Sequence, residues 1–151
     1  MWKLAGLALW MTSSAAASPG PATAACDLHG PTLVEVDRAK DGTHEHQITK
    51  ILEAGGWTAS DRKPDELSGC VPDADLERLR GELAKATWNV TKARFHCDAM
   101  SPVHTDYTVK GKLVWTAKLC SGESLDKDSA AAIADLDQLV KKLAPQRTPL
   151  Q

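Results

Sequence analysis

The segment Val71–Val90 constrains the fold most, because it has the pattern of an amphipathic helix. One stripe of apolar side chains recurs in it at helical spacing and consists of Leu76, Leu79, Leu83 and Ala86. Charged side chains fall mainly on the other faces, and Asp73 is placed to cap the first turn. A helix of this kind needs an apolar surface to lie on, and the flanking segments have the patterns of strands that would supply one.

The sequence before this helix predicts a β-hairpin followed by a loop. Thr32–Ala39 is typical of a first strand, and Lys40–Thr43 contains an Asp-Gly pair suited to a tight turn. His44–Leu52 then alternates weakly and predicts a second, partly exposed strand. Trp57–Gly69 is polar and rich in turn-forming residues, so we expect a surface loop anchored by its tryptophan.

The sequence after the helix predicts an extended segment and a second hairpin. Trp88–Cys97 is the extended segment, and Asp98–His104 is expected to form a loop. Thr105–Leu119 gives the strongest β signal, since β-branched and aromatic residues flank a tight turn at Lys110–Lys112.

A second amphipathic helix is expected near the end of the chain, over Ser129–Leu143, after a loop at Ser121–Asp128. Its apolar stripe consists of Ile133, Leu136, Leu139, Val140 and Leu143. Pro145 ends it. Hairpins require antiparallel pairing, so we predict an α+β fold with an antiparallel sheet of about four or five strands and two helices packed on one face.

Residues 1–25 have the features of a secretory signal peptide followed by a tract of small residues. Lys3 supplies the positive charge, and the apolar run Leu4–Met11 is too short to span a bilayer. Small residues allow cleavage after Ala17 or after Ala24. We therefore expect export to the periplasm or the medium, a single domain over residues 26–145, and a mobile tail over residues 146–151.

The four cysteines of an exported chain predict two disulfides, for which three pairings exist. Cys97 and Cys120 both lie at the open end of the second predicted hairpin, which favours a Cys97–Cys120 bridge. That pairing leaves Cys26–Cys70, which would pin the N-terminal arm to the loop before the first helix. The alternative for Cys26 is lipidation, because the preceding Thr-Ala-Ala resembles a degenerate lipobox and would make the chain a structural lipoprotein of the cell envelope.

A histidine pair is the most suggestive local motif. His44 and His46 lie two residues apart on a predicted strand, so their side chains share one face and could chelate a metal ion with a third ligand. The candidates for that third ligand are His29, His96 and His104. The alternative interpretation is an exposed polar strand beside a turn.

The net charge and the lack of a catalytic motif in the sequence argue against two classes of function. The net charge is −2 and no basic run is present, which argues against a nucleic-acid partner. No nucleophile elbow accompanies any serine, so we predict a protein that is not an enzyme and has no cofactor.

Three parts of the chain resemble small bacterial domains of the emfourin type. They are the helix Asp73–Ala86, the hairpin Tyr107-Thr-Val-x-Gly-Lys, and the closing helix Ile133–Leu143. Domains of that type are protein inhibitors of metallopeptidases, so the resemblance implies a protein partner and an inhibitory role. Together these features predict a non-enzymatic exported binding domain that acts on another protein. The alternatives are a metal-dependent protein that uses His44 and His46, and an envelope lipoprotein anchored at Cys26.

Overall fold

The computed structural model describes residues 26–61, 66–92, 101–148 and 150. It contains a six-stranded antiparallel sheet in the order β4-β3-β2-β1-β6-β7. The strands of this sheet are β1 (Thr32–Lys40), β2 (His46–Leu52), β3 (Gly56–Ser60), β4 (Leu67–Cys70), β6 (Val103–Val109) and β7 (Lys112–Lys118). The predicted α+β class is confirmed, but the sheet has more strands than expected.

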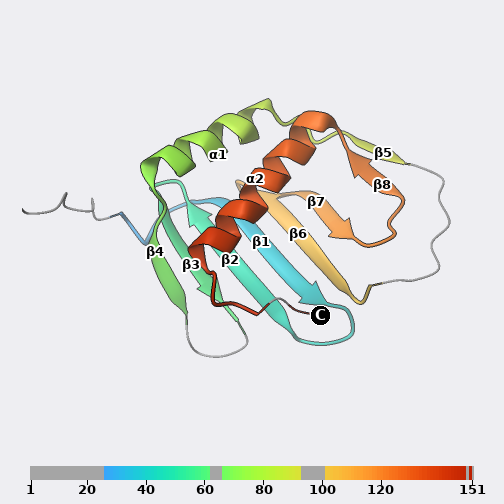
Figure 1. Cartoon of the computed structure of the whole chain (residues 1–151), viewed down its shortest axis with the longest axis horizontal. Coiled ribbons are helices and arrows are strands. Elements are labelled where there is room, and N and C mark those ends of the chain that lie inside the picture. The colour runs from blue at the N-terminus through green and yellow to red at the C-terminus, as the bar shows by residue number, and fades with distance from the viewer. Residues whose placement is uncertain (1–25, 62–65, 93–100, 149, 151) are drawn as a thin grey trace, which may run out of the picture.

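Two helices, α1 (Asp73–Lys85) and α2 (Lys127–Leu143), lie over the same face of this sheet and contact each other (Figure 1). Leu79 of α1 and Leu136 and Leu139 of α2 are at most 1 % exposed, and they pack in one core with Ile51 of the sheet. Pro72 is the N-cap residue of α1, so Asp73 is the first helical residue and not the cap. A proline there costs nothing, because the first helical turn has no internal partner for its amides.

The segment Trp57–Gly69, expected to be a surface loop, contains β3 and β4. Trp57 and Ala59 are buried while Thr58 and Ser60 are less so, which is the alternation of a strand with one covered face. Gly69 lies opposite Trp57 across the β3–β4 pair, and a Cβ atom on it would come within 2.8 Å of the indole Nε1. This glycine therefore leaves room for the indole to lie over β4.

The segment Ser121–Asp128, also expected to be a loop, contains the short strand β8 (Glu123–Leu125), which pairs with β5 (Val90–Lys92). Each of these strands has three residues, too few to give a periodic pattern. Residues 93–97 of the extended segment predicted over Trp88–Cys97 lie outside the described residues. So do the first three residues of the loop expected over Asp98–His104, whose last two residues belong to β6.

The predicted hairpin over Thr105–Leu119 is confirmed as β6 and β7, which are joined at Lys110 and Gly111. Both turn residues have positive φ, 48° and 77°. This is the backbone of a type I′ turn, whose twist matches that of the flanking strands.

Cys26 and Cys70 form a disulfide, as one of the two predicted pairs. The bridge holds the N-terminal arm at the outer strand β4, where Asp27 also forms a parallel bridge with Gly55. Cys97 lies outside the described residues, so the Cys97–Cys120 bridge stays a prediction. The signal peptide predicted for residues 1–25 also lies outside them, and no helix within the described part of the chain is long and apolar enough to cross a membrane.

Candidate functional site

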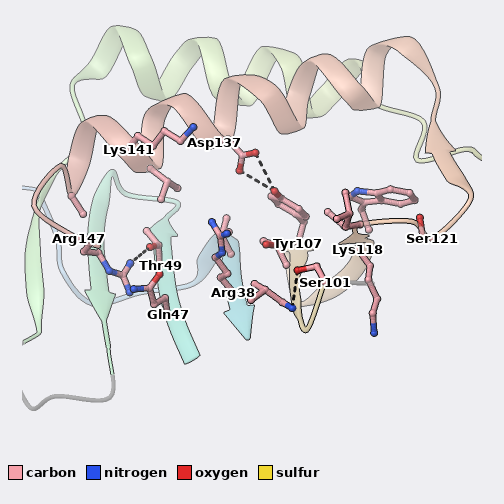
Figure 2. A pocket seen from close by; sticks show the side chains of 18 of the residues that line it. Arg38, Gln47, Thr49, Ser101, Tyr107, Lys118, Ser121, Asp137, Lys141 and Arg147 are labelled. Carbon is pink, nitrogen blue, oxygen red and sulfur yellow. Dashed lines mark hydrogen bonds between the residues drawn. The ribbon is translucent and has the colours of Figure 1, made fainter. Parts of the chain in front are cut away.

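A groove of about 630 Å³ lies between α2 and the part of the sheet formed by β1, β2, β6 and β7 (Figure 2). One end is bounded by the segment after α2, at Ala144 and Arg147. The other end is bounded by the segment after β7, at Leu119 and Glu123. The groove therefore combines a sheet floor with a helical wall.

The register of the sheet explains which side chains form the floor. Val36 of β1 pairs with Thr49 on one side and Tyr107 on the other, and Tyr107 pairs with Trp115. This gives one row of four side chains across the strands, and all four line the groove. Because side chains alternate between the faces of a strand, the next row on the same face is two residues away.

That second row consists of Gln47, Arg38, Thr105 and Ala117, and all four again line the groove. The floor is therefore apolar near β7 and more polar toward β2. Its one formal charge in these two rows is the guanidinium of Arg38.

Tyr107 joins the floor to the helical wall. Its hydroxyl donates to Asp137 of α2, with oxygen–oxygen distances of 2.9 and 3.2 Å to the two carboxylate atoms. Burial raises the pKa of Asp137, and the Tyr107 hydrogen bond and the charges of Lys141 and Arg38 offset part of that effect. Burial and the neighbouring carboxylate likewise raise the pKa of Tyr107.

Arg38 rises from β1 toward α2 beside this pair (Figure 2). Its Nε atom is buried and has no hydrogen-bond partner within the described part of the chain. The Asp137 carboxylate, whose charge interacts with that of Arg38, accepts from Tyr107 but not from this Nε. A donor that is removed from water without a partner is costly.

Arg147, which the sequence placed in a mobile tail, closes the β2 end of the groove. Its guanidinium donates to Thr49 Oγ1 at 2.7 Å, to the Ser60 carbonyl at 2.6 Å and to Asp61 Oδ1 at 3.0 Å. The side chain of Gln47 donates to the Thr148 carbonyl at 2.7 Å. These contacts hold the residues that follow α2 against β2 and β3.

The histidine pair does not line the groove, and only His46 belongs to the sheet, on the face opposite that of Gln47. His44 precedes β2 and is exposed, whereas His46 Nδ1 lies 3.0 Å from Asp37 Oδ1. His104 Nδ1 lies 2.6 Å from Asp41 Oδ1, so it contacts a different carboxylate. Among the described residues no group of three histidine, cysteine or acidic side chains could hold a metal ion, and His96 lies outside them. The metal alternative therefore stays a prediction.

The sequence analysis missed the groove residues Arg38, Tyr107, Asp137 and Arg147 as candidates. Arg38 carried a usable signal, because it continues the alternation of Val34 and Val36 and must share their covered face. A charged residue on the covered face of a strand is unusual enough to mark a site. No protein-family model matches this sequence, and no curated protein is significantly similar to it.

Proposed function

We propose that this chain is a non-enzymatic exported binding domain and that the groove under α2 is its binding site. The observation that supports the proposal best is the buried Arg38 Nε without a partner, on the floor of a groove that is otherwise partly apolar. Small-molecule sites have volumes of roughly 300–1,000 Å³ and combine apolar walls with a few polar groups that fix orientation. The volume of about 630 Å³ lies within that range.

The Cys26–Cys70 disulfide supports the exported part of the proposal. Disulfides persist in oxidising compartments and are rare in the cytosol. A lipid anchor on Cys26 would need the same sulfur atom that forms this bridge, so the bridge and the lipoprotein alternative exclude each other.

A protein partner would be compatible with the same groove, because a side chain or chain end of that partner could enter it. The resemblance to emfourin-type domains makes metallopeptidases the first proteins to test as partners. If the chain inhibits a metallopeptidase, and a substitution that fills the groove abolishes the inhibition, the role of peptidase inhibitor is assigned to this groove.

A neutral fluorescent probe tests the proposal without depending on the charge of Arg38. N-phenyl-1-naphthylamine, which brightens in apolar surroundings, should bind the oxidised chain in a saturable one-to-one manner. Ala117→Trp fills the floor and should abolish this binding, while Ala134→Trp, on the exposed side of α2, should leave it unchanged.

Circular dichroism would show whether both variants fold. If Ala117→Trp does not fold, Thr105→Phe blocks the same row of the floor and replaces it. Probe binding that is equal in the blocked and the control variants would refute the groove as the site, and so would the absence of binding to the unmodified chain.

A further inference from the structure

We infer that the ligand of the groove is a small amphiphile that carries one carboxylate, bound by Arg38, and an apolar body that lies along the floor toward β7. The inference rests on the proposed function and names the chemical class that this groove would select. Four features of the groove support it.

The first feature is the distribution of charge around the groove. Arg147 is paired with Asp61, and Lys118, whose ammonium points away from α2 in Figure 2, is paired with Asp41 at 2.7 Å. Arg38 has no ion pair of this kind among the described residues, and its Nε is the one buried guanidinium atom in that part of the chain without an acceptor. The floor of the groove therefore carries one guanidinium, that of Arg38, whose Nε donor has no acceptor.

The second feature is the match between this donor and a carboxylate. A guanidinium binds a planar carboxylate through two parallel hydrogen bonds, and such charge-assisted pairs are shorter and stronger than neutral ones. Because Nε is closed to solvent in this structure, the Arg38 side chain would shift so that the anchored carboxylate supplies the acceptor that Nε lacks.

The third feature is Asp137, which limits the ligand to a single negative charge. Its carboxylate faces Tyr107 of β6, Arg38 of β1 and Lys141 of its own helix. A dianion such as a phosphate monoester would place more negative charge beside it than one guanidinium and one rim lysine can balance. Glu123 at the far end, 3.9 Å from Lys92, adds a further negative group.

The fourth feature is the distribution of polar and apolar lining. Toward β7 and α2 the groove is walled by Val103, Trp115, Ala117 and Val140, which suit a hydrocarbon or aromatic body. Toward β2 the polar groups are already engaged, because Gln47 bonds to Thr148 and Thr49 bonds to Arg147. An extended peptide would need free hydrogen-bonding groups on that side, so the lining favours a small amphiphile.

Decanoate and decanamide test this inference, because they share the apolar body and differ in charge. Each would be used to displace N-phenyl-1-naphthylamine from the oxidised chain at pH 7.5. We expect decanoate to bind about ten- to a hundredfold more tightly than decanamide, as a charge-assisted bond replaces a neutral one.

Arg38→Met removes the guanidinium and retains an apolar side chain of similar length. In this variant decanoate should lose its advantage over decanamide, while the neutral probe still binds and so shows an intact groove. Lys112→Met, at an exposed position of β7, is the matched control and should retain the full preference.

The outcomes separate the inference from the proposed function. Equal binding of decanoate and decanamide, with both lost in Ala117→Trp, would leave the groove as a binding site and overturn the carboxylate. Displacement by an apolar peptide with a free C-terminus but not by decanoate would overturn the small amphiphile. A preference for decanoate that survives Arg38→Met would overturn the role of Arg38.

Discussion

The hydroxyl of Tyr107 lies 2.9 Å from one carboxylate oxygen of Asp137 and 3.2 Å from the other. This hydrogen bond connects the middle of β6, on the floor of the groove, to α2, which forms its wall. The Tyr107 ring is buried, in the floor row that also contains Val36 and Thr49. The hydrogen bond is therefore shielded from water, which disfavours the ionised form of Asp137.

We predict that Asp137→Asn changes the pH dependence of stability. Folding raises the pKa of Asp137, so its ionised form costs stability. This cost is absent below the pKa of the unfolded carboxyl, about 4, and grows as the pH rises through the folded value. Asp137→Asn should therefore raise the free energy of unfolding at pH 8 relative to the parent chain, and the gain should vanish near pH 3.5.

Tyr107→Phe is the companion variant, because it removes the donor and retains the acid. The pKa of Asp137 should then rise further, and the loss of stability between pH 4 and pH 8 should steepen. Urea unfolding followed by circular dichroism at several pH values measures both effects. A stability difference between Asp137→Asn and the parent that does not vary with pH would contradict the account.

We predict that Arg147→Ala destabilises the fold although it lies four residues after the end of α2. The substitution would leave Asp61 without its cation and the Ser60 carbonyl and Thr49 hydroxyl without their donor. The Arg147 side chain is only 11 % exposed and Thr49 is buried, so water restores the bond to Thr49 poorly, whereas it can reach the half-exposed Asp61. We expect a loss of about 2 kcal/mol in the free energy of unfolding.

Lys141→Ala, at the exposed rim of the groove, is the control and should change the stability by no more than about 0.5 kcal/mol. Equal stability of the two variants would mean that the segment after α2 contributes little to the fold.

The helices and the strongest strands could be predicted because their signals are local. α2 carries a full apolar stripe ended by Pro145, and the β6–β7 hairpin has Gly111 in a turn that needs positive φ. The strands β3 and β4 were missed because each is short and its stability depends on pairing with the neighbouring strand. The fit of Trp57 over Gly69 becomes visible only once the two strands are paired.

Only part of the groove could be predicted, because its residues come from elements that are separated in the sequence. The position of Arg38 on the covered face follows from alternation in β1. The lack of a partner for its Nε does not, because that depends on where side chains from other elements, such as Asp137 of α2, lie around it. Arg147 looked like part of a mobile tail, since nothing in the local sequence indicates that Asp61 lies beside it.

We predict that the Cys26–Cys70 bridge contributes about 4 kcal/mol to stability, because it closes a loop with a sequence separation of 44. The double variant Cys26→Ser, Cys70→Ser should unfold at a correspondingly lower urea concentration. Intact mass of the protein purified from its native envelope, before and after reduction and alkylation, checks the chemistry. An acylated Cys26 would contradict the bridge.

We predict that Asp126→Ala lowers the thermal unfolding temperature at pH 7. Asp126 caps α2 by accepting from the amides of Asp128 and Ser129, and it also accepts from the Thr87 hydroxyl and the Asn89 amide. The Ser129 hydroxyl also donates to this carboxylate, and this bond, followed by the others, holds the pKa of Asp126 well below its usual range.

The lowered pKa of Asp126 determines how its contribution to stability changes with pH. A carboxyl whose pKa is lowered by folding contributes stability above its unfolded pKa of about 4, and the contribution is lost as the pH falls. The difference between the parent and Asp126→Ala should therefore shrink below pH 4. Asp128→Ala, exposed in the same turn, is the control and should have a smaller effect.

The measurement that tests the central claim most directly is the Nε–Hε resonance of Arg38 in a ¹H–¹⁵N spectrum during titration with decanoate. If the groove is the binding site and Arg38 binds the carboxylate, this resonance should move downfield. The amides of the floor rows, such as Tyr107 and Ala117, should shift with the same saturation curve. An Arg38 Nε–Hε resonance that does not move while decanoate saturates the protein, or shifts confined to the opposite face around Asp37 and His46, would contradict the account.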